Sequence, residues 1–147
     1  MLKNEMRLDF SAIPENEAFA RMVISAFVMP LDPTVDEIND VKTAISEAVT
    51  NAIIHGYEGK GGTVRMAGRL DDNLLTVEVT DAGIGISNIL QAREPLFTSK
   101  PDMERSGMGF TVMESFMDSI EVESNPGRGT TIRMKKAFGG NVGENEQ

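Results

Sequence analysis

The side chains best suited to chemistry in this sequence are those of Glu47 and Asn51. They are four residues apart, so they would project from the same face of a helix. The carboxylate of Glu47 could orient or deprotonate an attacking hydroxyl group. The amide oxygen of Asn51 could bind a hard cation such as Mg²⁺ beside phosphate groups. Taken alone, the same spacing is also typical of a solvated polar stripe, so both interpretations stay open.

Asp81 follows an alternating apolar run and precedes Gly83 and Gly85. A carboxylate at the end of a strand can accept a hydrogen bond from an exocyclic amine. The two glycines would leave room for a flat ring and allow backbone N–H groups to approach it. The alternative is an ordinary strand-to-helix turn that the aspartate caps.

Two further Gly-x-Gly pairs follow, at residues 107–109 and 127–129. Gly107 and Gly109 would open a helix, whose free N–H groups form an anion site. The alternative is an ordinary mobile loop before a helix. Thr130 could reach a ligand or serve only its strand. Residues of the preceding loop that could close over phosphates are Thr98, Ser99, Lys100 and Arg105. In this order after residues 47 and 51, the glycine pairs indicate a nucleotide site.

Other nucleotide signatures do not occur in the sequence. It has no Gly-x-x-x-x-Gly-Lys-Ser/Thr loop, and none of its Gly-x-Gly pairs has a third glycine three residues on. The single histidine, His55, lies near the expected end of a helix, where a packing or capping role is expected. A P-loop enzyme and a dinucleotide-binding domain are therefore disfavoured.

The composition restricts the classes of partner. The net charge is −9 and only Lys135 and Lys136 are adjacent basic residues, which argues against direct nucleic-acid binding. The absence of cysteine fits a reducing cytoplasm. No stretch approaches the roughly 20 apolar residues of a membrane span, and the first residues lack the apolar core of a signal peptide. The sequence predicts a cytoplasmic protein without a membrane anchor.

The elements that must position these side chains follow from hydrophobic periodicity. Strands are predicted at residues 6–10, 63–70, 74–80, 120–122 and 130–134, and helices at 14–28, 34–56, 86–93 and 107–117. This order favours an α+β, two-layer fold, with a mixed, mostly antiparallel sheet and helices on one face. One domain would cover residues 1–138. The polar, glycine-rich residues 139–147 are typical of a disordered tail.

Two helices have explicit local signals. Thr34 and Glu37 have the spacing of a capping box, and Gly56 is expected to end that helix in a left-handed conformation. The first helix is expected to bury one face, and Arg21 is expected to lie well away from that face. The residues of that predicted face are Phe19, Met22, Val23, Ala26 and Phe27. In the helix at 107–117, the predicted apolar side comprises Phe110, Met113, Phe116 and Met117.

Four segments together resemble the nucleotide-binding boxes of the GHKL ATPase and kinase superfamily. They are Glu47 to Ala52, Asp81 to Gly85, Arg105 to Phe110 and Gly129 to Thr131. Over residues 5–137 the sequence is most similar to the anti-sigma factor kinases of Bacillus-type bacteria. The segments 96–101 and 104–114 resemble the sporulation, anti-sigma-F branch of that family. The general stress-response, anti-sigma-B branch is the nearest alternative.

The resemblance implies a Bergerat-type fold that binds ATP, with ADP as product. It implies that Asn51 binds Mg²⁺, that Asp81 binds the adenine amine, and that Glu47 lies near the attacking hydroxyl. It also implies a homodimer with two protein partners. One is a sigma factor, sigma-F, held away from RNA polymerase. The other is an anti-anti-sigma factor phosphorylated on a serine. Exposed Arg21 on the first helix becomes a candidate partner contact.

Two other functional classes remain in view. The chain could be a nucleotide-gated module that sequesters its partner without catalysis. It could also be the catalytic domain of a sensor histidine kinase, but such a domain needs a phosphoacceptor histidine on a dimerisation helix. His55 lies beside the Glu47–Asn51 motif and is poorly placed for that role. The expected activity is therefore that of an ATP-dependent protein serine/threonine kinase.

Overall fold

The computed structural model describes residues 1–86 and 109–139 of the chain. One five-stranded sheet has the order β1-β2-β3-β5-β4, and each neighbouring pair of strands is antiparallel. The strands are β1 (Lys3–Ser11), β2 (Thr63–Asp71), β3 (Leu74–Asp81), β4 (Ser119–Asn125) and β5 (Gly129–Ala137). The predicted sheet is confirmed, and over these residues it is antiparallel rather than mixed.

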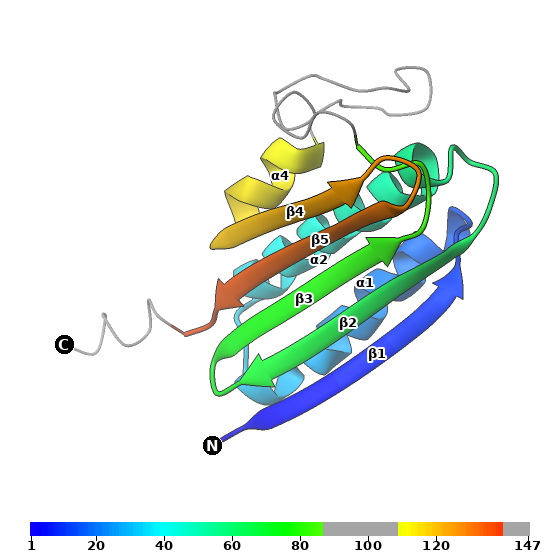
Figure 1. Ribbon diagram of the computed structural model, residues 1–147. Coiled ribbons are helices and arrows are strands. Elements are labelled where there is room, and N and C mark those ends of the chain that lie inside the picture. The colour runs from blue at the N-terminus through cyan, green and yellow to red at the C-terminus, as the bar shows by residue number, and fades with distance from the viewer. Residues whose placement is uncertain (87–108, 140–147) are drawn as a thin grey trace.

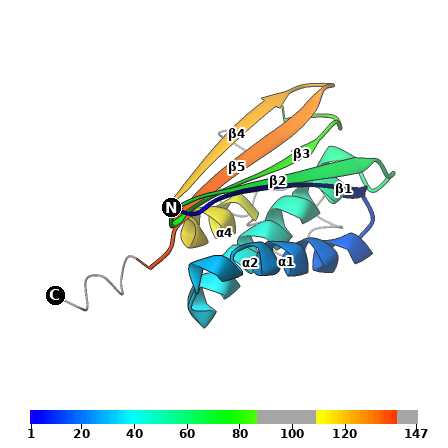
Figure 2. The same cartoon turned by 90° about the horizontal axis from the view of Figure 1, so that it is seen from below.

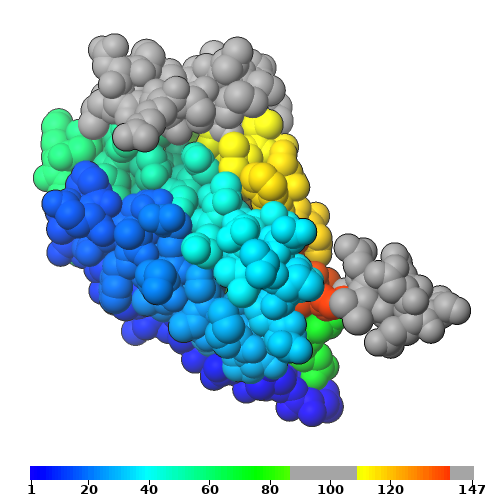
Figure 3. Space-filling model, turned by 180° about the vertical axis from the view of Figure 1, so that it is seen from behind, coloured from blue at the N-terminus to red at the C-terminus, as the bar shows by residue number. Residues whose placement is uncertain are grey.

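The helices form a second layer on one face of this sheet (Figures 1 and 2). They are α1 (Glu15–Phe27), a 3-10 turn (Met29–Leu31), α2 (Val35–Thr50), a π-helical turn (Asn51–Gly56) and α4 (Gly109–Phe116). Helix α2 packs against both α1 and α4, and Figure 3 shows this layer from its outer side. The predicted two-layer α+β architecture is confirmed. The helix expected at 86–93 and the expected tail fall almost wholly outside the described residues.

The core lies between the two layers. Strand β3 alternates, so that Leu75, Val77 and Val79 face the helices and are buried. Helix α2 contributes a stripe with the spacing of one helical face. Its buried residues are Val41, Ala44, Ile45, Ala48 and Val49. None of the helices within residues 1–86 and 109–139 has the length and apolar character needed to cross a membrane.

The predicted buried face of α1 is correct only in part, because Val23 and Phe27 pack against the core but the fully buried positions are different ones. Ala20 and Ile24 are fully buried, whereas Phe19 and Met22 are 47% and 65% exposed. Apolar residues occur on several sides of α1, so periodicity alone did not fix its rotation about its axis. Ala20 and Ile24 form the centre of the buried face, while Phe19 and Met22 remain outside. In α4, Phe116 was also expected on the buried side but is 37% exposed.

The predictions for the two ends of the second helical segment have different outcomes. At the start, Thr34 Oγ1 accepts from the N–H of Glu37, while Glu37 Oε1 accepts from the N–H of Thr34, so the capping box is confirmed. At the end, α2 passes into a π-helical turn in which the N–H of Tyr57 donates to the carbonyl of Ala52 at 2.9 Å. Gly56 is not left-handed, which corrects the prediction. The positive φ values fall at Glu58 (56°) and Gly59 (72°).

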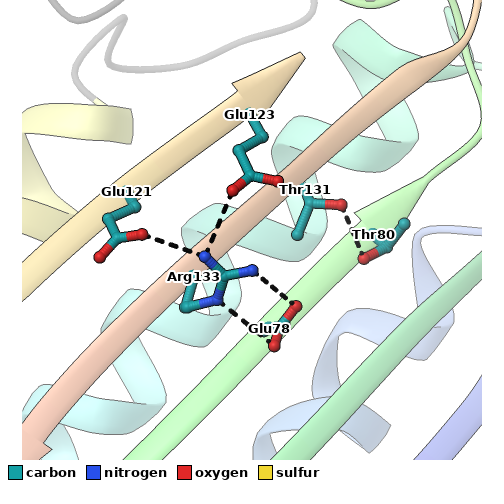
Figure 4. Close-up of polar contacts among 6 residues, drawn as sticks. All are labelled: Glu78, Thr80, Glu121, Glu123, Thr131 and Arg133. Carbon is teal, nitrogen blue, oxygen red and sulfur yellow. Dashed lines mark hydrogen bonds and ion pairs between the residues drawn. The ribbon is translucent and has the colours of Figure 1, made fainter. Parts of the chain in front are cut away.

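The other face of the sheet is polar. Arg133 on β5 lies between Glu78 on β3 and two glutamates of β4 (Figure 4). Its guanidinium nitrogens are 3.0 Å from Glu121 Oε2 and 3.4 Å from Glu123 Oε1 and Glu78 Oε1. Hydrogen bonds and the charge of Glu78 raise the pKa of Arg133 further above its ordinary value. These side chains satisfy one another, as expected for a sheet face in contact with water.

Candidate functional site

Asp81 is the last residue of β3 and a buried carboxylate. In the antiparallel register it pairs with Thr130 at the start of β5. Its side chain accepts hydrogen bonds from the backbone N–H groups of Gly83, at 2.9 Å, and Thr130. Asp81 and Thr130 are each only 5% exposed. The structure therefore brings two of the predicted site residues together at one end of the sheet.

Burial controls the charge of this carboxyl group. Desolvation raises the pKa of Asp81 above its usual value near 3.8, although the backbone hydrogen bonds from Gly83 and Thr130 favour the ionised form. A buried carboxylate with spare acceptor capacity is a suitable partner for an N–H donor of a ligand.

Three positions around Asp81 are glycines, and a side chain at any of them would overlap neighbouring atoms. A Cβ added to Gly56 would lie 2.7 Å from the carboxylate carbon of Asp81. A Cβ on Gly83 would overlap the carbonyl oxygen of Gly56, and one on Gly129, whose φ is 117°, would overlap the carbonyl oxygen of Asp81. These glycines allow the π-helical turn, the segment after β3 and the start of β5 to meet.

The segment after Asp81 is fixed on both sides. On one side, the N–H of Ile84 donates to the carbonyl of Gly56 at 2.9 Å. On the other, the carbonyl of Ile84 accepts from the N–H of Gly127 at 2.6 Å, in the turn between β4 and β5. A Cβ on Gly85 would overlap the carbonyl oxygen of Asn125. The first and third Gly-x-Gly pairs therefore pack against each other.

Ser124 is a polar residue of this site that the sequence did not indicate. Its hydroxyl oxygen accepts from the N–H of Ile86 at 2.7 Å and lies 2.8 Å from Thr130 Oγ1. Tyr57, also missed, connects to the segment after β3 through its hydroxyl group. It is the chain's single tyrosine and directly follows the predicted helix end, which was the available signal. A serine on an alternating strand gives no comparable signal.

Glu47 and Asn51 approach the site from the helical layer. Glu47 lies in the last turn of α2, and Asn51 begins the π-helical turn that ends at Gly56, beneath Asp81. Both side chains are half-buried. The change of helix type occurs between these two residues, and π-helical turns are frequent at functional sites.

Several other predicted site residues cannot be placed in this arrangement. Gly109 begins α4, which packs against α2. Arg21 lies elsewhere, on α1, with its Nε 3.2 Å from Glu17 Oε1. The predictions for Thr98, Ser99, Lys100, Arg105 and Gly107 lie outside the described residues.

The side chains of this site fit an adenine nucleotide with a magnesium ion. Asp81 offers a buried acceptor surrounded by glycine backbone, where a flat ring with an amino group could bind. Within residues 1–86 and 109–139, no three histidine or acidic side chains gather into a metal cluster. A cation near Asn51 would therefore take its other ligands from phosphate oxygens and water, which is usual for Mg²⁺.

Comparisons with known proteins identify the family of the chain. Residues 10–136 match the family model of the histidine kinase-like ATPase domain. The chain is 64% identical over 138 residues to the anti-sigma F factor of Clostridium acetobutylicum, covering 94% of this chain and 96% of the relative. It is 53% identical over 136 residues to the anti-sigma F factor of Bacillus subtilis, covering 92% and 93%.

A solved structure has a similar fold at low identity. The RsbU and RsbW domains of Rv1364c from Mycobacterium tuberculosis match with a TM-score of 0.64 and 16% identity. The match covers 92% of this chain and 32% of that one, and it concerns the fold alone. From the family model and the close relatives, the chain belongs to the histidine kinase-like ATPase family and, within it, to the family of the anti-sigma F factors.

Proposed function

We propose that this chain is an ATP-dependent serine kinase that also sequesters a sporulation sigma factor, sigma-F, from RNA polymerase. Its phosphorylation substrate would be a serine of the anti-anti-sigma factor, which that modification inactivates. The observation that carries the proposal is the buried Asp81 carboxylate, enclosed by glycine backbone and adjoining the helix of Glu47 and Asn51. The names of the close relatives support the sigma-factor partner.

Each site residue has a proposed task. Asp81 accepts a hydrogen bond from the adenine amino group, and Thr130 with the backbone of Gly83 and Gly85 shapes the surrounding pocket. Asn51 holds Mg²⁺, which neutralises phosphate charge when bound. Glu47 orients the serine hydroxyl of the partner and takes its proton. Phosphoryl transfer depends mainly on positioning and charge neutralisation, so few protein groups are needed.

The loop before α4 supplies the remaining proposed contacts. Thr98, Ser99, Lys100 and Arg105 would contact the phosphates together with Gly107 and Gly109. Arg21 on α1 would contact a protein that binds to the homodimer. This surface lies on the helical layer, where α1 leaves apolar side chains exposed.

The kinase proposal is tested with labelled ATP, Mg²⁺ and the purified anti-anti-sigma factor. We expect label on a serine of that partner, and Glu47→Gln should slow the transfer by about a hundredfold or more. ADP binding should remain near the wild-type level, because glutamine keeps the size of the side chain and only removes its charge.

Two results would contradict this assignment. Transfer at the wild-type rate in Glu47→Gln would remove Glu47 from the mechanism. An unlabelled partner with wild-type protein, despite nucleotide binding, would favour a nucleotide-gated sequestering module. The sequestration of the sigma factor is tested separately. The amount of sigma factor retained on the immobilised protein is measured once in the presence of ATP and once in the presence of ADP.

A further inference from the structure

We propose that Tyr57 is the positioning residue that fixes the segment carrying Asp81, and that it thereby sets the selectivity of the pocket for adenine over guanine. This inference rests on the proposed function, because it concerns the same nucleotide pocket. Tyr57 follows the π-helical turn and is half-buried.

The hydroxyl group of Tyr57 joins two distant parts of the chain. It donates a hydrogen bond to the carbonyl of Thr63, at the start of β2, at 2.6 Å. It accepts one from the N–H of Ala82, directly after Asp81, at 2.8 Å. A phenol has a single O–H donor, so both of its principal hydrogen-bonding roles are used here. Phenylalanine could fill the same volume but would make neither bond.

The rest of the residue is also held in place. Its backbone N–H donates to Ala52, and the preceding carbonyl of Gly56 accepts from Ile84. Its ring packs against Gly62, where an added Cβ would lie 2.5 Å from Cε1 of the ring and φ is 155°. The position of the hydroxyl group is therefore fixed. Tyr57 also directly follows Gly56, the glycine that packs against the Asp81 carboxylate.

This fixed point bears on recognition of the base. Adenine presents an amino group to a carboxylate, whereas guanine presents a carbonyl oxygen at the equivalent ring position, and a carboxylate repels that oxygen. Such discrimination requires the Asp81 carboxylate to stay at a defined place. A water molecule could replace the hydrogen bond to Ala82, but it would not tie that peptide to the π-helical turn.

The test measures binding of ADP and GDP, each with Mg²⁺, to the full chain and to Tyr57→Phe. A neutral hydrogen bond contributes about 0.5–1.5 kcal/mol, so we expect ADP to bind about twofold to tenfold more weakly. GDP binding should change little, and the ADP-to-GDP preference should fall by a similar factor. Amide hydrogen exchange should rise at Ala82 and Gly83 and remain slow at Ile132.

Thr80→Val is the matched control, since it removes the 3.1 Å hydroxyl contact with Thr131 on the open face of the sheet. It should leave the ADP-to-GDP preference unchanged. Gly62→Ala, which displaces the ring while keeping the phenol, should reproduce the loss of preference. An unaltered preference in Tyr57→Phe, or exchange that rises equally throughout the sheet, would overturn the inference. If wild-type protein bound neither nucleotide, the proposed function would fail first and this inference with it.

Discussion

At the scale of single residues, Asp81 combines a structural and a proposed binding role. Its hydrogen bond to the N–H of Gly83 is the turn-capping contact that the sequence left as an alternative. Its burial against Gly56 is a feature that a simple cap would not need. The two roles can be separated, because burial of the charge costs stability while a ligand amine would offset that cost.

Asp81→Asn is expected to leave the melting temperature at neutral pH unchanged or higher, and to weaken ADP binding about tenfold to a hundredfold. The sign follows from the raised pKa. The folded state holds its proton more tightly than the unfolded chain, so this group contributes most stability at low pH. That contribution falls as the pH rises from the ordinary value near 3.8 through the raised folded pKa.

Thermal unfolding from pH 4 to 8 and calorimetric titration with ADP check this expectation. The melting temperatures of wild type and Asp81→Asn should converge as the pH falls through the raised folded pKa of Asp81, where the wild-type carboxyl takes up its proton. A large loss of stability at neutral pH with normal ADP binding would instead make Asp81 a structural cap only.

At the scale of elements, the start of α2 determines how firmly Glu47 and Asn51 are presented. The capping box is supplemented by a bond from the N–H of Gly139 to Glu37 Oε2 at 2.9 Å, which ties the helix to the residues after β5. Burial alone would raise the pKa of Glu37. Hydrogen bonds from Thr34 and Gly139, with the charge of Lys136, lower it overall. Glu37 therefore contributes stability that is lost as the pH falls from about 4.5 through its lowered folded pKa.

Thr34→Ala should reduce the free energy of unfolding by about 1 kcal/mol, because the N–H of Glu37 loses its side-chain acceptor. Urea denaturation at pH 7 measures this loss. Thr34→Ser keeps the acceptor and is the control that should remain close to wild type. Equal stability of the alanine and serine variants would show that the cap contributes little to this helix.

At the scale of the whole molecule, the two outer faces differ. The open face of the sheet is covered by ion pairs such as those of Arg133, whereas the helical layer leaves Phe19, Met22 and Met29 between 47% and 65% exposed. Exposed apolar side chains gathered on one side of a protein are typical of an interaction surface. This asymmetry favours the helical layer as the interface of the proposed homodimer.

Met22→Glu should therefore weaken self-association about tenfold or more, because assembly would bury an unpaired charge. Sedimentation equilibrium of the full chain measures the effect, and retention of the sigma factor on the same variant provides a second measurement. Ser119→Glu adds the same charge on β4, at an exposed position. That control should associate like wild type, and equal weakening by both variants would argue against α1 as the interface.

The sequence could predict the features that depend on nearby residues. The capping box of Thr34 and Glu37 and the alternation of β3 needed only local hydrogen bonds and a repeating pattern, and both are confirmed. The burial of Ala20 in place of Phe19 could not be read from periodicity, since several faces of α1 are apolar and packing against α2 and the sheet selects one.

The order of the chemical groups can be read from the sequence alone: a carboxylate and an amide on one helix are followed by an aspartate and three glycine pairs. The roles of Gly56 and Tyr57, in contrast, depend on the tertiary fold. Gly56 packs beneath Asp81, and Tyr57 bonds to Ala82, a residue 25 positions away. Such contacts arise when separate elements pack together, and no local pattern encodes the distance between them.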